Sequence, residues 1–294
     1  MKRTERLITN TIRIAGSSSI LFVLLIFIFL LREGLPALSE ISIDTLFATR
    51  WYPIEDLFGV LPLISGSFIV TVFSMIIALP FGIGTAIYIG EIAPRNVKEI
   101  LKPLVEVLAG IPSVVLGFIG ILVLSPAMRV GLNLPTGLTA LTGAILLALI
   151  SIPTIVSIAE DALYAVPGSY REAAYAVGAT QWQVIWTVVL PAARSGLLNA
   201  VMLGVGRSLG ETMAVMMVTG NAPTIFTGLK SFIAPVRTMT ATIASEMGEV
   251  ATGSAHYHVL FFIGIILFLF SLVVNVTSSS LNMRPKRGKD QVVS

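Results

Sequence analysis

The chain has 294 residues, of which 55% are hydrophobic and 12% charged, and its mean hydropathy is +0.91. A soluble domain of this size could not bury so much apolar surface, so the composition excludes a soluble globular protein and indicates an integral membrane protein. The formal net charge of +3 gives little reason to expect nucleic acid as a partner. The chain has no cysteine, which excludes a disulfide framework and thiolate metal sites.

Six apolar runs are long enough to cross a membrane. A helix needs about 20 mostly apolar residues to span the roughly 30 Å hydrocarbon layer, because lipid offers the backbone no hydrogen-bonding partner. The runs are 14–31, 61–89, 104–124, 138–159, 197–219 and 259–279. The alternation of apolar and polar residues typical of a membrane barrel is absent. The sequence therefore predicts an all-α, polytopic membrane protein with six transmembrane helices.

The first run, 14–31, also has features of a secretory signal, because lysine and arginine precede it and Ala37, Leu38 and Ser39 follow it. We favour a retained transmembrane helix. The apolar and small residues continue for longer than in a usual signal, and no small-x-small cleavage pattern directly follows Leu31. The mass of the mature N-terminus would decide between these interpretations.

The lysines and arginines predict the orientation of the chain, because cytoplasmic loops carry an excess of both. Thirteen of the 19 lysines and arginines lie at the two termini and in the connections that follow the second and fourth apolar runs. Five lie in the other connections, and Arg207 lies within a span. Both termini are therefore expected in the cytoplasm. The chain divides into a cytoplasmic N-terminal segment, first helix and external loop at 1–60, a core at 61–280, and a basic cytoplasmic tail at 281–294.

Two segments on the other side of the membrane are candidate docking surfaces for an external protein. The segment 32–59 combines acidic residues with Trp51, Tyr52 and Pro53, a mixture suited to a folded loop. The segment 220–258 contains threonine, serine, proline and glycine throughout.

The longest cytoplasmic connection, 160–196, has a composition that favours helices. We expect a short helix near 169–177, a break at Gly178, and a second helix that ends near Pro191. Small side chains beside a glutamate would allow another protein to approach closely and to meet a charged contact. An ordinary amphipathic linker on the lipid surface explains the same composition.

Glutamate, paired alanines, a glycine and Leu-Pro follow one another in this loop, and the residues concerned are Arg171, Glu172, Ala173, Ala174, Gly178, Leu190 and Pro191. In this order they resemble the EAA loop of permease subunits in ABC importers. The resemblance implies a type I ABC importer permease fold and a place in the plasma (inner) membrane. It also implies that the loop forms a coupling helix, which sits in a cleft of a cytoplasmic ATPase and transmits its closure to the membrane helices.

Other stretches extend the resemblance over nearly the whole chain, to the permeases of phosphate importers. Residues 104–117, 206–214 and 220–224 are similar to that family, and 235–238 and 246–249 resemble the PstC type more than the PstA type. The resemblance implies a subunit that moves inorganic phosphate into the cytoplasm by alternating access. The implied partners are a sister permease of the PstA type, a cytoplasmic ATPase dimer of the PstB type, an external phosphate-binding protein of the PstS type, and membrane lipid.

Arg207 lies within the fifth predicted span, where an arginine costs roughly 2.5 to 3.5 kcal/mol on insertion scales and must face protein or water. Glu211 follows four residues later, so we expect it on the same helical face as a partner for Arg207. A guanidinium group matches two phosphate oxygens at once. We hypothesise that Arg207 lines the anion path while Glu211 holds its side chain. A purely structural ion pair is the alternative.

Small and helix-breaking residues mark further positions of interest. Gly206 and Gly210 form a small-xxx-small pair that lets helices approach closely, either within the subunit or against the sister permease. Pro112 and Pro153 interrupt backbone hydrogen bonding within predicted spans. Bending of the helices is favoured over the alternative, in which freed carbonyl groups coordinate a solute.

The sequence contains no G-x-x-x-x-G-K-[ST] nucleotide loop and no set of nucleophile, base and orienting residue. We therefore expect no enzyme activity in this chain and ATP hydrolysis in a separate subunit. His256 and His258 offer two metal ligands without an evident third, so neither a metal nor a cofactor is expected.

Two alternative functions stay open. The first is an ABC permease for another oxyanion, such as molybdate, sulfate or phosphonate, which would share the loop motif. The second is an ATP-independent anion carrier, in which Arg207 and the two proline-containing spans form a self-sufficient site. Reconstitution separates them, because uptake by the chain alone supports the carrier.

Overall fold

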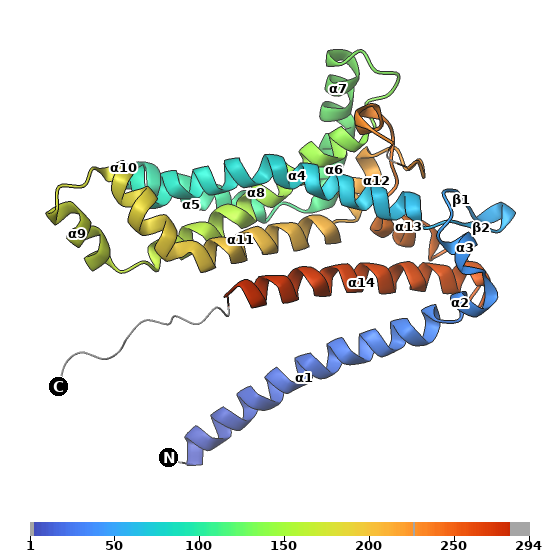
Figure 1. The fold of residues 1–294 in the computed structure, drawn as a ribbon, viewed down its shortest axis with the longest axis horizontal. Helices are drawn as coiled ribbons and strands as arrows, with labels where there is room; N and C mark the ends of the chain where they lie inside the picture. Colours follow the sequence, from blue (N-terminus) through green and yellow to red (C-terminus); the bar gives the residue numbers. More distant parts are fainter. Residues whose placement is uncertain (1–2, 226, 283–294) are drawn as a thin grey trace.

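The computed structural model describes residues 3–225 and 227–282, and helices account for most of them. Figure 1 shows long helices running between two ends of an elongated bundle. The α-helices are α1 (Arg3–Gly34), α2 (Ala37–Glu40), α3 (Ile43–Leu46), α4 (Leu61–Ile87), α5 (Arg95–Ala109), α6 (Ser113–Ile119), α7 (Ser125–Gly131), α8 (Ala140–Tyr164), α9 (Gly168–Ala176), α10 (Gln181–Val184), α11 (Leu190–Gly210), α12 (Met213–Val218), α13 (Met239–Glu246) and α14 (Ala255–Asn282). The shorter elements are the 3-10 helices η1 (Pro53–Glu55) and η5 (Leu229–Ile233), the π-helices η2 (Tyr88–Ile92), η3 (Gly120–Leu124) and η4 (Ile185–Val189), and the strands β1 (Trp51–Tyr52) and β2 (Leu57–Phe58).

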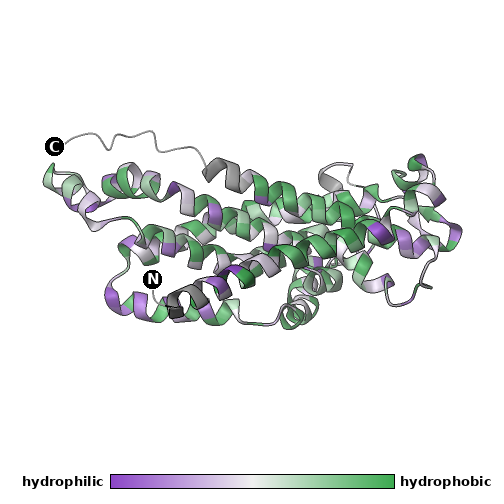
Figure 2. Cartoon of the chain, turned by 90° about the horizontal axis from the view of Figure 1, so that it is seen from below, coloured by the Kyte–Doolittle hydropathy of each residue, from purple (hydrophilic) through white to green (hydrophobic). Residues whose placement is uncertain are grey.

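The predicted number of membrane spans is confirmed among the described residues. Six helical stretches are long and apolar enough to cross a membrane: Ile8–Glu40, Leu61–Ile92, Ser113–Gly131, Ala140–Tyr164, Gln181–Gly210 and Ala255–Thr277. Figure 2 shows hydrophobic residues along these helices and hydrophilic ones concentrated towards the two ends of the molecule. Of the predicted C-terminal tail, residues 283–294 lie outside the described residues.

The centre of the bundle is formed by α4 and α8, which pack along their length, with α11 against α8. The close approach of α4 and α11 to α8 depends on glycines that face Ile155 of α8. A Cβ atom at Gly82 of α4 would lie 2.7 Å from the Ile155 side chain, and one at Gly204 of α11 would lie 2.8 Å from it. These contacts place α4, α8 and α11 in one buried core, in which Ile155 is fully buried.

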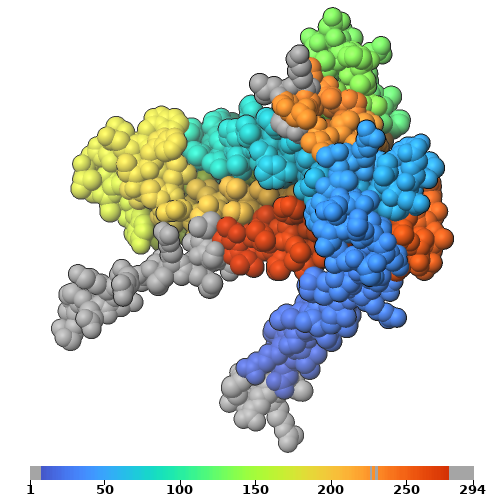
Figure 3. Space-filling model, turned by 45° about the vertical axis from the view of Figure 1, so that its right-hand side comes forward, coloured from blue at the N-terminus to red at the C-terminus, as the bar shows by residue number. Residues whose placement is uncertain are grey.

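The helix α1 is peripheral. No residue in the apolar window of its span is buried within the chain, and Figure 3 shows it projecting from the body of the molecule. Its C-terminal half contacts α14, where Phe27 stacks on Phe268 with ring centroids 4.8 Å apart and Gly34 lies against the backbone of Phe262. α1 therefore leaves most of its apolar surface for lipid or for another subunit.

The third predicted span was placed wrongly. We expected it at 104–124, but α5 ends at Ala109, and a new helix begins at Ser113 and continues to Gly131. α5 carries charged residues along one side and has no buried residue, so its amphipathic pattern is that of a surface helix. Pro112 stands at the N-cap of α6, at the boundary between the two helices rather than within a span. Pro153, in contrast, lies buried inside the continuous helix α8.

The fifth span also differs from its prediction. A second helix was expected to end near Pro191 and a span to run over 197–219, but one helical stretch continues from Gln181 to Gly210. A proline lacks the N–H group and clashes with the carbonyl of the preceding turn. The π-helix η4 widens the backbone just before Pro191, and η2 and η3 likewise precede Pro94 and Pro126. The wider turns accommodate Pro126 and Pro191 without ending the spans.

One end of the bundle, the hairpin end, consists of α2, α3, the β1–β2 hairpin and α13. The strands pair antiparallel with Trp51 opposite Phe58 and Tyr52 opposite Leu57. Trp51 and Phe58 are almost fully buried in a cluster with residues at the start of α14, such as Leu260. The expectation of a folded loop at 32–59 is therefore confirmed.

The other end, the α9 end, consists of α5, η2, α9, α10 and the first turns of α11. α9 stands out from the bundle (Figure 1). The short helix expected near 169–177 corresponds to α9, and Gly178 follows it with φ +83°. Glycine adopts this left-handed conformation without the steric strain of a side chain, so the predicted break is confirmed.

Candidate functional site

The residues of the loop motif fall on two faces of α9. Glu172 and Ala173 are exposed, whereas Ala174 is partly buried and packs against the central core. The loop then turns through Gly178, and Thr180 and Gln183 form a reciprocal capping box at the start of α10. Glu172 and Ala173 thus face away from the bundle, whereas Ala174 on the opposite side of α9 contacts the core.

Arg171 faces inward, towards a partner that the sequence analysis did not identify. Its Nη2 atom lies 2.6 Å from Oε1 of Glu91, and its Nε atom donates to Oε2 of Glu91 at 3.2 Å. It also donates to the backbone carbonyls of Val166 at 2.7 Å and Leu163 at 2.9 Å. The hydrogen bond with Glu91 raises the pKa of Arg171, so the guanidinium stays charged. Arg171 is therefore an internal anchor of the loop, unlike its exposed neighbour Glu172.

Leu190 and Pro191 begin α11 directly after the π-helix η4. They lie within the stretch that connects α10 to the rest of the fifth span, so the loop motif continues into a membrane helix without a flexible joint. Leu190 is partly buried and packs against the central core. A displacement of α10 would therefore be carried into α11.

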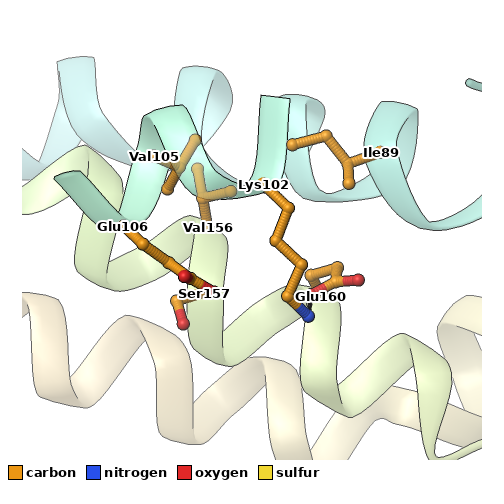
Figure 4. A pocket seen from close by; sticks show the side chains of 7 residues that line it. All are labelled: Ile89, Lys102, Val105, Glu106, Val156, Ser157 and Glu160. Carbon is orange, nitrogen blue, oxygen red and sulfur yellow. Dashed lines mark hydrogen bonds and ion pairs between the residues drawn. The ribbon is translucent and has the colours of Figure 1, made fainter. Parts of the chain in front are cut away.

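A second charged contact attaches α5 to α8. Lys102 Nζ lies 2.7 Å from Oε2 of Glu160, and Figure 4 shows the two side chains reaching towards each other beside Glu106 and Ser157. Glu160 is almost fully buried, with a 6% exposed side chain, whereas that of Lys102 is 46% exposed. The hydrogen bond to Glu160 raises the pKa of Lys102, so its ammonium stays protonated at neutral pH. The pair holds an otherwise exposed helix against the core.

Arg207 and Glu211 are not on one helical face. α11 ends at Gly210, and Glu211 is the extended C-cap residue, so the expected i, i+4 pair does not form. The carboxylate of Glu211 accepts a hydrogen bond from the backbone N–H of Ala214 at 3.3 Å, at the start of α12. Arg207 is exposed in the last turn of α11, where the helix dipole favours a positive charge, and no described residue forms an ion pair with it.

Hydroxyl groups fix the helices beside Arg207. Ser208 is buried, and its Oγ lies 2.9 Å from Oγ of Ser151 on α8 and accepts a hydrogen bond from Ser74 on α4 at 3.3 Å. Ser208, Glu211 and hydroxyl groups of α4 and α13 line a small cavity. Sequence reasoning did not identify this cluster, because single serines in apolar helices carry no spacing signal.

Gly206 and Gly210 make no internal contact. Both are exposed, and a Cβ atom built at either would meet nothing within 4 Å among the described residues. Of the two expected uses of this pair, packing within the subunit is therefore not observed. Packing against a second subunit stays a prediction.

The two histidines are engaged in the hairpin end. His256 Nε2 lies 2.8 Å from Oε2 of Glu246, and His258 Nδ1 lies 2.7 Å from the carbonyl oxygen of Glu33. No group of three or more histidine and acidic residues within 3–225 and 227–282 could hold a metal ion.

Comparisons with known proteins agree on one family. Residues 78–286 match the family described as binding-protein-dependent transport system inner membrane component. The probable ABC transporter permease protein YqgH of Bacillus subtilis is 43% identical over 243 residues, which cover 81% of this chain and 78% of that protein. The phosphate transport system permease protein PstC of Mesorhizobium japonicum is 38% identical over 267 residues, covering 84% and 80% of the two chains.

Solved structures show the same fold. A bacterial alginate ABC transporter in complex with a pentasaccharide-bound periplasmic protein matches with a TM-score of 0.63 and 14% identity, over 97% of this chain and 98% of that chain. The inward-facing MetNI methionine ABC transporter matches with a TM-score of 0.56 and 21% identity, over 76% and 92%. The chain therefore belongs to the family of binding-protein-dependent transport system inner membrane components, as a multi-pass permease with the fold of type I ABC importers.

Proposed function

We propose that this chain is one permease subunit of an ATP-driven importer that moves inorganic phosphate into the cytoplasm. The observation that carries the proposal is the similarity to PstC proteins, at 38% identity in Mesorhizobium japonicum and 33% in both Xylella fastidiosa and Pasteurella multocida, over 84% to 88% of this chain. Those proteins are phosphate transport system permeases by name. The chain itself performs no covalent chemistry in this proposal.

The α9 end is the proposed contact with a cytoplasmic ATPase dimer. Glu172 and Ala173 are exposed on a helix that projects from the bundle, which suits insertion into a cleft of another protein. Closure of the ATPase on ATP would displace α9 and turn the path outward, where phosphate arrives from an external binding protein. ATP hydrolysis would reset the subunit. This orientation places both termini in the cytoplasm and follows the excess of lysine and arginine on that side.

The proposed anion path runs past Arg207, alongside a sister permease. An exposed arginine within an apolar helix must find water or another subunit, and a guanidinium binds phosphate oxygens two at a time. Glu211 lies at the break between α11 and α12, where it caps α12 and adds negative potential that keeps phosphate from binding too tightly. The open surface at Gly206 and Gly210 suits close packing of the sister subunit.

Uptake of radiolabelled phosphate tests the proposed substrate. Cells that lack the chain and then regain it should recover phosphate uptake, with sulfate and molybdate in excess as competitors. A loss of phosphate uptake in the presence of excess sulfate or molybdate would instead assign that oxyanion as the substrate. In proteoliposomes, uptake should require the ATPase and the binding protein, and uptake by the chain alone would instead establish an ATP-independent carrier.

Arg207→Gln tests the proposed path. We expect phosphate uptake to fall by at least about tenfold in an assembled complex, because the bidentate contact with phosphate is lost. Arg129→Gln is the matched control, since Arg129 also lies exposed in the last turn of a helix, α7. Uptake equal to that of the control would remove Arg207 from the path.

The proposed contact with a sister permease is tested by Gly206→Leu. The added side chain meets nothing within the described chain, so the isolated subunit should keep its stability while co-purification of the sister permease decreases. Gly204→Leu is the contrasting variant, because Ile155 leaves no room for a side chain at that position. Unchanged co-purification with Gly206→Leu would place the interface elsewhere.

A further inference from the structure

Glu91 lies where three separate segments of the chain meet. It belongs to the π-helix η2, which continues directly from α4, and its carboxylate receives Arg171 of α9. Its backbone carbonyl oxygen accepts a hydrogen bond from Nε2 of Gln181, at the start of α10, at 2.9 Å. The two helices of the exposed loop, α9 and α10, therefore both contact one residue just beyond α4.

The contact is more enclosed than a surface ion pair. The side chain of Glu91 is 10% exposed and that of Arg171 is 22% exposed. Nε and Nη2 of Arg171 contact the two carboxylate oxygens of Glu91. Nη2 also reaches the carbonyl of Leu163 in the last turn of α8, and Nη1 reaches that of Val166 just after α8. A planar guanidinium held at several points has a fixed orientation, so a displacement of Arg171 would displace Glu91 with it.

Apolar packing of α9 against the bundle is sparse. α9 has no fully buried residue, and among the residues of α9 itself only Ala174 packs against the central core. The contacts that hold α9 to α4 are therefore mainly polar. α4 in turn packs along its length on α8, so movement at η2 reaches the centre of the bundle.

We propose that Glu91 is a positioning residue that couples movement of α9 to α4 through its bidentate contact with Arg171 and its backbone contact with Gln181. The proposal rests on the proposed function, since it assumes that an ATPase moves α9. Loss of the contact lets α9 move without α4, so ATP is hydrolysed without a matching change in the transport path.

The test compares ATP hydrolysis with phosphate uptake in the complete complex, reconstituted with the ATPase, sister permease and binding protein. For Glu91→Gln, we expect ATP hydrolysis to stay within about twofold of wild type while phosphate moved per ATP falls by about fivefold, in the range by which residues between two sites change their coupling. Glu91→Asp keeps the charge and should recover part of that ratio. Arg171→Lys keeps the positive charge without the planar fork and should lower it.

Glu99→Gln is the matched control, because Glu99 forms a 2.8 Å ion pair with Arg95 that is exposed to solvent. The amount of assembled complex is measured for every variant by co-purification, which separates coupling from folding. A Glu91→Gln ratio equal to that of Glu99→Gln, or a fall in hydrolysis and uptake in equal proportion, would overturn the proposal. If the wild-type complex imports a different oxyanion, the proposed function fails and the same ratio is measured with that ion.

Discussion

The two ends of the bundle are held together by different physical means. At the hairpin end, Trp51, Phe58 and residues of α14 form a closed apolar cluster, and Glu246 lies beside it with three partners. At the α9 end, α9 has no buried residue, and Arg171 and Lys102 tie α9 and α5 to the bundle through ion pairs. Burial of apolar side chains therefore holds the hairpin end together, whereas polar contacts attach α9 and α5 to the bundle.

The difference follows from what each end is made of. At the hairpin end, aromatic side chains pack against the apolar surface of α14. Burial of these side chains stabilises the hairpin end and does not require two polar atoms at one fixed distance and angle. At the α9 end, α9 and α5 have no buried residue, so directional contacts have to fix these two helices.

The largest expected effect is at the hairpin end. Trp51 is 3% exposed, and its Nε1 atom donates to Glu246 at 3.2 Å. Trp51→Ala should lower the free energy of unfolding by about 3 to 5 kcal/mol, because it leaves a cavity in the cluster and removes a hydrogen bond. Equilibrium unfolding in mixed micelles measures this change.

The control for this variant is at the α9 end. Trp182 is 60% exposed, and Trp182→Ala should change the unfolding free energy by less than about 0.5 kcal/mol. Equal effects of the two variants would contradict the contrast between the two ends.

A second, smaller effect concerns the charges of the hairpin end. Glu246 Oε1 lies 2.7 Å from Arg237, and its Oε2 lies 2.8 Å from His256. Glu246→Gln should cost about 3 kcal/mol, since the partly buried Arg237 is left without its counter-charge. Glu249→Gln, at an exposed position in the same segment, should have almost no effect on the same unfolding measurement. A loss of under about 1 kcal/mol for Glu246→Gln would show that apolar packing alone holds this end.

Much of the fold could be predicted from apolar runs and charges. The number of spans, the short helix in the loop 160–196 and the break at Gly178 depend on local composition, and the structure agrees with them. The span at 104–124 was wrong because hydropathy alone does not show that α5 is amphipathic and ends before Pro112. The continuation through Pro191 was missed because a π-helix leaves no clear mark in the sequence.

The candidate site was predictable only where residues are neighbours in sequence. The loop motif is local, so its residues could be identified, but Glu91 lies 80 positions from Arg171 and belongs to another helix. Arg207 and Glu211 are four residues apart, and this spacing suggested a pair that the end of α11 at Gly210 prevents. An acidic residue at the end of an apolar run was the one available signal for Glu91.

The Lys102 contact tests whether the α9 end depends on paired charges. Lys102→Met should cost about 1.5 kcal/mol in unfolding free energy, because Glu160 keeps a buried carboxylate without its partner. The double variant with Glu160→Gln should recover most of this loss, since no unpaired charge remains. If the two single losses add in the double variant, the residues do not act as a pair.

The smallest expected effect separates burial from distance. Arg95 and Glu99 on α5 form an ion pair with an N to O distance of 2.8 Å, almost the same as the 2.7 Å between Lys102 and Glu160. The exposed fractions of the Arg95 and Glu99 side chains are 89% and 62%. Arg95→Gln should therefore change the unfolding free energy by less than about 0.5 kcal/mol, and by still less in high salt, because water and ions screen an exposed pair. An effect as large as that of Lys102→Met would mean that distance alone determines the strength of these contacts, and that burial of Glu160 does not distinguish its pair with Lys102 from the exposed pair of Arg95 and Glu99.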